Sequence, residues 1–285
     1  MLPLKTTIKP ALILVMLMLL TACTTKIMYN YIDWIAEWYA TDLVTLNDEQ
    51  DWLLNDAVKS ELAWHRKHQL PFYIESLEEL EKNIHSGLNL EHLEKFYAVH
   101  EHGWIELKRR VTPTISRLLK TLSDGQIDEL EKHLKEQEND LADEYVNKPA
   151  NELITRRSER MIDKIEDWTG SLNKQQIQLI QNWSNNVKPV AKTWIDTRRQ
   201  WQASLIHILR NNRDKSDYND LMKELFYNSR KFWPNWYHDA YYQNVDLTMT
   251  MFATLANKLT PKQQLRLLNK IDGLKTQFIE LYDEQ

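Results

Sequence analysis

The sequence predicts an all-α protein, an irregular multi-helix bundle assembled from helical hairpins. Glycine is scarce, with five among 285 residues, and no stretch shows the apolar–polar alternation of a half-buried strand. A helix-start signal recurs along the chain, and the segments that follow it carry apolar residues at helical spacing. These observations together favour helices packed on one another over any sheet-containing fold.

The N-terminal segment predicts a secretion signal that ends at a lipid-acceptor cysteine. Residues 11–20 are ten consecutive apolar residues behind Lys5 and Lys9, and this run is shorter than the roughly 20 residues that cross a bilayer. The following Leu-Thr-Ala-Cys resembles the bacterial lipobox, at which the leader is removed and the cysteine acylated. We therefore expect residues 1–22 to be a signal peptide and residues 23–285 to be the mature, lipid-anchored domain.

Cys23 is the only cysteine of the chain, so an internal disulfide is excluded. The alternative to acylation is an ordinary thiol in an ordinary signal peptide or short membrane anchor. Two or more acyl chains would anchor the protein stably, at about 0.8 kcal/mol per buried methylene. In lipoproteins that this segment resembles, an aspartate after the cysteine retains the protein in the inner membrane, and here Thr24 follows. We expect attachment to the outer membrane of a Gram-negative cell, facing the periplasm.

The charge balance limits the partners that the protein can take. Lys and Arg number 36 against 41 Asp and Glu, which gives a net charge of −5, and the chain has no basic tract. A mildly acidic chain of this kind is a poor candidate for binding nucleic acid. The expected partners are the membrane, through the N-terminal lipid, and an unidentified protein, peptide or envelope polymer.

The first expected helix follows the cysteine closely. Tyr31, Trp34 and Trp38 recur at helical spacing between Tyr29 and Tyr39. Such side chains suit a water–lipid boundary and the edge of a core equally well. We expect the core, because a buried first helix would tie the tether to the domain.

The recurring signal reads Leu, then Asn, Ser or Thr, then two residues, then Gln. It predicts a capping box, in which the second residue accepts a hydrogen bond from an early backbone N–H and the Gln reaches back to the cap. Four copies begin at Leu46, Leu122, Leu172 and Leu259, and a weaker copy begins at Leu88. Their irregular spacing argues against a solenoid and favours degenerate hairpins.

Glycine and proline mark where these helices should stop. Gly87 and Gly170 precede helix starts and are expected to take positive φ at the ends of the preceding helices. Breaks or kinks are expected at Pro71, Pro113, Pro149, Pro189 and Pro234. Roughly ten helices are expected. Residues 146–151 are the best candidate for a sub-boundary, although we favour one continuous helical body.

Two family resemblances arise from these motifs. The lipobox-like segment, the run at 29–34, the unit at 46–50 and the stretch from Ala63 to Pro71 together resemble an uncharacterised family of proteobacterial all-helical lipoproteins. That resemblance implies location and fold but no activity. The helix-start repeats are also similar to those of Spy and CpxP, periplasmic proteins that bind unfolded clients, although only the copy at Leu259 is a strict Leu-Thr-x-x-Gln. This second resemblance implies a chaperone or stress protein.

No motif predicts a catalytic site, and no cofactor is expected. His65 and His68 lie three residues apart, and other histidines follow with carboxylates nearby, but no His-Glu-x-x-His is present. We interpret these histidines as surface residues and expect no metal. An envelope hydrolase with a His/Glu site is kept as a third alternative.

The stretch from Arg230 to Asn244 holds six aromatic residues around Pro234. Clustered aromatic side chains dominate binding hot spots, so the candidate binding surface comprises Trp233, Trp236, Tyr237 and Tyr241. The alternative is a corner where helices meet. Complete burial of Trp233, Trp236 and Tyr237 in one core would exclude a binding surface.

Overall fold

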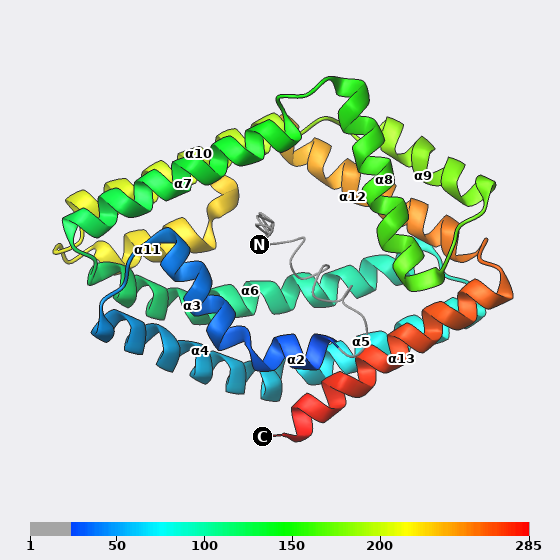
Figure 1. Ribbon diagram of the computed structural model, residues 1–285, viewed down its shortest axis with the longest axis horizontal. Helices are drawn as coiled ribbons and strands as arrows, with labels where there is room; N and C mark the ends of the chain where they lie inside the picture. The colour runs from blue at the N-terminus through cyan, green and yellow to red at the C-terminus, as the bar shows by residue number, and fades with distance from the viewer. Residues whose placement is uncertain (1–23, 285) are drawn as a thin grey trace, which may run out of the picture.

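The computed structural model describes residues 24–284, and every regular element within them is a helix. Twelve α-helices and one short 3-10 helix line the sides of a flattened ring (Figure 1). This confirms the predicted all-α bundle. The predicted signal peptide and Cys23 lie outside the described residues. No helix between Thr24 and Asp283 is long and apolar enough to cross a membrane.

The helices have the following bounds. The first half of the chain forms α2 (Thr24–Asn30), α3 (Ile32–Leu43), α4 (Asp48–His68), α5 (Leu70–Ser86), α6 (Leu90–Lys120) and α7 (Asp124–Tyr145). The second half forms α8 (Ala150–Thr169), α9 (Lys174–Asn186), α10 (Ala191–Asn211), α11 (Tyr218–Tyr227), the 3-10 helix η1 (Ser229–Phe232), α12 (Asn235–Ala256) and α13 (Pro261–Asp283).

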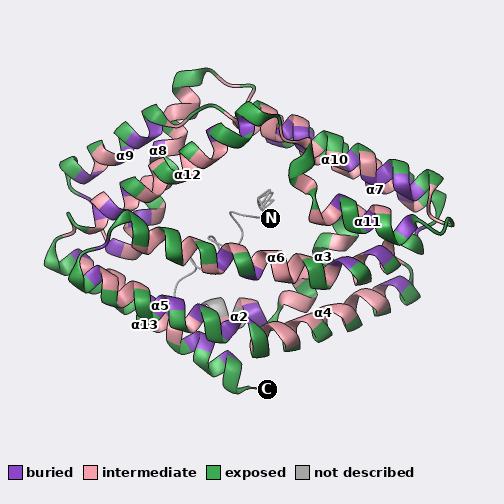
Figure 2. Cartoon of the chain, turned by 180° about the vertical axis from the view of Figure 1, so that it is seen from behind, coloured by how far each residue is buried: buried purple, intermediate pink, exposed green. Residues whose placement is uncertain are grey.

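Three buried apolar clusters hold these helices together. One centres on Ile127 where α7, α10 and α11 meet, a second on Leu274 between α5 and α13, and a third on Ile180 where α8, α9 and α12 meet. Figure 2 shows the buried residues along the seams between helices and the exposed residues on their outer faces. The long helix α6 packs on α4, α5, α11 and α12, and so connects the clusters.

The predicted helix starts are confirmed. Complete capping boxes begin α4, α7, α9 and α13, with Asn47, Ser123, Asn173 and Thr260 as the N-caps. The weaker copy begins α6, where Asn89 accepts a hydrogen bond from the backbone of His92. Gly87 and Gly170 end α5 and α8 with φ of 108° and 79°, as predicted.

The four boxes associate in two pairs that the sequence did not predict. Gln50 of α4 and Gln126 of α7 donate their side-chain amides to each other's Oε1, at 3.1 and 2.7 Å. Gln176 of α9 and Gln263 of α13 do the same at 2.9 and 3.0 Å. Each glutamine also donates to a backbone carbonyl two residues before its partner's N-cap. A glutamate would cap a helix equally well but has no N–H to donate, so the pairing explains the use of glutamine.

A break or kink was expected at Pro113, and the break is wrong, because α6 continues through this residue. Proline deprives the carbonyl four residues earlier, that of Arg109, of its helical N–H partner. The hydroxyl of Tyr227 in α11 donates to this carbonyl at 3.1 Å. A tertiary contact therefore replaces the lost bond and allows a helix of 31 residues. By contrast, Pro71, Pro149 and Pro234 lie at helix starts.

The expectation of a buried first helix is also wrong. Helix α3 has no buried residue, and Tyr31, Trp34 and Trp38 are exposed. The first described residues are held on the body instead through α2, where the side chain of Tyr29 is buried and packs in the cluster around Leu274. Helix α3 lies on α4 and α7, and turns its aromatic face away from them.

Candidate binding surface at the start of α12

The predicted aromatic residues lie where η1 passes into α12. Trp233 is the residue after η1, and Pro234 caps the start of α12 with extended backbone, as its fixed φ allows. Trp236, Tyr237 and Tyr241 follow on the first turns of α12. Helix α12 packs on α6 and α9, and the ion pair of Arg230 with Glu101 ties the region before α12 to α6.

Trp233 is the centre of the aromatic cluster. Its ring centroid lies 4.8 Å from that of Tyr237 and 5.0 Å from that of Tyr241, both in tilted or edge-on geometry. Such offset contacts contribute about 0.5–1.5 kcal/mol each beyond the area they bury. Trp236 touches only the edge of this cluster, with its ring centroid 6.1 Å from that of Tyr237.

Arg230 fixes the polar side of the cluster. Its guanidinium lies 5.5 Å from the ring centroid of Trp233, donates to the hydroxyl of Tyr242 at 2.8 Å and pairs with Glu101 of α6 at 2.6 Å. Burial is the largest influence on Arg230 and opposes its charge, but the hydrogen bond to Glu101, together with the charge of Glu101 and the nearby hydroxyls of Tyr242 and Tyr241, outweighs burial and raises the arginine pKa. The cation is therefore retained and held in one orientation above an indole ring.

The residues of the aromatic cluster differ in burial, from a buried tyrosine to an exposed tryptophan. Tyr237 is buried, and burial raises the pKa of its hydroxyl to about 12. Trp233 and Tyr241 are half-buried, whereas 53% of Trp236 is exposed. The three residues Trp233, Trp236 and Tyr237 are therefore not enclosed in one core, so the condition that would exclude a binding surface is not met. A partly exposed ring on a packed aromatic base is typical of a hot spot.

A second aromatic cluster, which the sequence did not predict, joins α2, α4, α5 and α6. The hydroxyl of Tyr29 lies 2.8 Å from Nδ1 of His65, and the ring of Tyr73 packs between His65 and His100 at 5.7 and 5.0 Å. Burial lowers the pKa of His65 to about 4 and also lowers that of His100. Both imidazoles are therefore neutral at pH 7, and they are structural rather than the surface residues that we expected.

Gly103 allows this cluster to close. A Cβ at this position would lie 2.6 Å from Oε1 of Gln69 and 2.7 Å from the hydroxyl of Tyr73. Spacing alone did not reveal the cluster, because its members come from four helices. The only sequence signal was a glycine in the middle of a strong helical pattern, which commonly marks a close approach.

The other histidines do not converge. His68 stacks on Trp64 of its own helix at 5.5 Å, and His102 pairs with Glu106 one turn away at 3.3 Å. Within residues 24–284 no group of three His, Cys, Asp or Glu side chains is placed to hold a metal ion.

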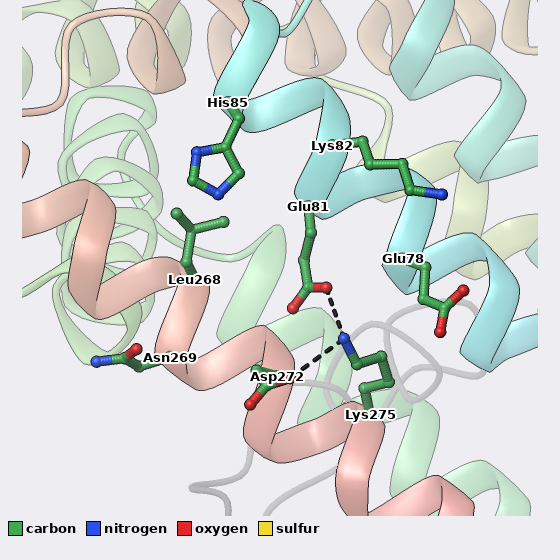
Figure 3. Close-up of a pocket in the computed structure, with 8 residues that line it drawn as sticks. All are labelled: Glu78, Glu81, Lys82, His85, Leu268, Asn269, Asp272 and Lys275. Carbon is green, nitrogen blue, oxygen red and sulfur yellow. Dashed lines mark hydrogen bonds and ion pairs between the residues drawn. The ribbon is translucent and has the colours of Figure 1, made fainter.

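A polar groove of about 580 Å³ lies between α5 and α13, away from the aromatic surface (Figure 3). Lys275 sits at its floor and bridges Glu81 at 2.7 Å and Asp272 at 3.1 Å. The bond to Glu81 is the main cause of the raised pKa of Lys275. Lys275 thus neutralises the two carboxylates that lie closest to it, one on each helix, and its own charge is already paired.

A model of a family of unknown function, DUF6279, matches residues 42–238, which is more than half of the chain. No curated protein and no solved structure matches. The matched range runs from the end of α3 through the paired helix starts of α4 and α7 to Trp233, Trp236 and Tyr237 at the start of α12. The chain therefore belongs to the DUF6279 family, whose function is unknown.

Proposed function

We propose that the protein is a lipid-anchored, non-enzymatic component of the bacterial envelope that binds a partner protein through the aromatic surface at the start of α12. The observation that carries the binding role is the exposed Trp236 beside the packed rings of Trp233 and Tyr241 and the fixed guanidinium of Arg230. Trp, Tyr and Arg are the side chains that contribute most to protein–protein hot spots. A protein partner is therefore favoured over an envelope polymer.

The anchor is supported by the sequence at the N-terminus. The short apolar run, the Leu-Thr-Ala-Cys segment and the absence of Asp after Cys23 are the features of an outer-membrane lipoprotein that faces the periplasm. Labelled palmitate is expected to enter the wild-type protein but not a Cys23→Ser variant. Labelling of the Cys23→Ser variant would contradict the anchor.

The binding role is tested by crosslinking in intact cells. A photoreactive phenylalanine analogue at position 236 is expected to capture one discrete protein. The matched control places the same analogue at Phe72 of α5, which is 57% exposed but lies outside the surface. Equal capture from both positions, or no capture from position 236, would contradict the proposed surface.

A Spy-like chaperone is the second candidate. It is favoured by aromatic side chains exposed on several helices, among them Trp52 of α4 and Phe72 of α5, since such rings can hold unfolded chains. Suppression of client aggregation by the Cys23→Ser protein, unaffected by Trp236→Ala, would favour the chaperone. The third alternative, a hydrolase, has weaker support, because the closest His/Glu pair, His102 and Glu106, is a one-turn pair on the surface of α6.

A further inference from the structure

We propose that Tyr31, Trp34 and Trp38 form a membrane-contact face that lies in the headgroup region of the bilayer holding the lipid anchor. The helical body would then rest directly on the membrane instead of hanging from a flexible tether. This inference rests on the proposed acylation of Cys23 and adds an orientation to it.

The three side chains share one exposed face. They are 58%, 61% and 53% exposed, and their spacing of three and then four residues places them along one side of the helix. Helix α3 packs on the cores through its partly buried Ile32 and Leu43, which lie on the side of the helix away from these rings. Exposed aromatic side chains gathered on one face of a helix commonly mark a site of contact with a partner or a membrane.

The position of this face relative to Cys23 identifies the membrane as its occupant. Helix α2 begins at Thr24, so no spacer separates the cysteine from the folded body. Lys26 pairs with Glu280 at 2.8 Å and Glu284 at 2.7 Å, and its backbone N–H donates to the side chain of Gln277 at 3.1 Å. These contacts hold α2 on α13 within three residues of the acyl chains.

The length of chain between the cysteine and Trp38 limits how far the aromatic face can lie from the lipid. Fourteen residues separate Thr24 from Trp38, which is about 21 Å along the helices at 1.5 Å per residue. If the helices stood upright on the membrane, Trp38 would lie well beyond a headgroup layer of about 5–8 Å. If they lie flat with the aromatic face down, all three rings reach that layer.

The chemistry of the face also fits the headgroup region. Tyrosine and tryptophan have apolar bodies and polar tips, and they are the residues enriched at the water–lipid boundary. At 100° per residue Asp33 points to another side of the helix, Glu37 lies at the edge of the aromatic face beside Trp34, and Asp42 follows one turn after Trp38 at its far end. The carboxylates of α3 therefore lie at the margins of the aromatic face or outside it, and the rings form its centre.

Single introduced cysteines test this orientation, because acylation leaves the native chain without a free thiol. Trp38→Cys is compared with Trp236→Cys, a control of equal exposure (53%) on α12, which packs mainly on α6 and α9. Each full-length variant is purified, its acylation is verified by mass, and it is reconstituted into phosphatidylethanolamine–phosphatidylglycerol vesicles. An impermeant maleimide then measures the labelling rate, which is normalised to the labelling in detergent. The same substitutions in unacylated Cys23→Ser protein provide the reference in water.

We expect the two positions to label alike in water, and Trp38→Cys to label severalfold more slowly than Trp236→Cys on vesicles. Equal rates on verified acylated protein would overturn this inference alone. Slow labelling of Trp38→Cys in the unacylated protein at high concentration would assign the face to a second copy and also overturn it. Absence of the acyl mass would overturn the proposed anchor and this inference together.

Discussion

The half-buried histidine between Tyr29 and Tyr73, His65, predicts that the protein loses stability in mild acid. In the unfolded chain His65 titrates near pH 6.5, whereas burial lowers its pKa in the folded protein to about 4. As the pH falls through this window, the unfolded chain binds the proton first. The free energy of unfolding therefore decreases from about pH 6.5 down to about pH 4 and is unaffected by this group above that range.

The magnitude follows from the size of the pKa shift. Each pH unit inside the window costs up to about 1.4 kcal/mol, so a change from pH 7 to pH 5 costs at most about 2 kcal/mol through His65. Because the residue is only half-buried, we expect about 1–2 kcal/mol. In the tautomer whose Nδ1 accepts from the hydroxyl of Tyr29, protonation would also remove that acceptor, which acts in the same direction.

Urea unfolding of the Cys23→Ser protein at pH 7 and pH 5 measures this loss. His65→Gln keeps an acceptor for Tyr29 but cannot titrate, so its loss between the two pH values should be smaller than that of wild type by about 1–2 kcal/mol. His68→Gln is the matched control, because His68 lies on the same helix and stacks on Trp64 at the surface. An unchanged pH dependence in His65→Gln, or an equal reduction in both variants, would refute the reasoning.

Three further predictions concern packing, and urea unfolding measures all of them. Gln176→Glu keeps the cap but removes the donor to Gln263, so it should cost more than about 2 kcal/mol, whereas Gln175→Glu at the exposed neighbouring position should change little. Gly103→Ala should cost about 1–3 kcal/mol because its Cβ would clash with the hydroxyl of Tyr73, while Gly125→Ala, with open space around it, should be neutral or stabilising. Tyr227→Phe should cost about 1 kcal/mol by leaving the carbonyl opposite Pro113 without its partner. Each of the first two predictions would be contradicted if the variant and its control lost the same free energy of unfolding. The third would be contradicted if Tyr227→Phe left the free energy of unfolding unchanged.

Local signals predicted the helices well, because capping is decided within a few residues. The starts at Asn47, Ser123, Asn173 and Thr260 and the stops at Gly87 and Gly170 depend on bonds that span three or four positions. These local signals do not specify which helices pack against each other. The glutamine pairs join residues 76 and 87 positions apart, and nothing in a single box specifies its partner.

The wrong predictions have the same origin. Pro113 breaks an isolated helix, but here Tyr227, 118 positions from Arg109, supplies the missing hydrogen bond. Tyr31 and Trp34 fit a core or a membrane equally well by composition, and only the position of α3 in the fold shows that they are exposed. The contacts among the aromatic rings around Trp233 were predictable because these residues lie within one short stretch, whereas the cluster around Tyr73 draws on four helices.

The intact mass of the mature protein purified from membranes tests the central claim most directly. The account predicts a chain that begins at Cys23 and carries the added mass of a diacylglyceryl group and a further acyl chain. The Cys23→Ser variant should lack these acyl groups, and its helical body should then be found in the aqueous fraction. A chain that retains residues 1–22, or one that begins at Cys23 with a free thiol, would contradict the account.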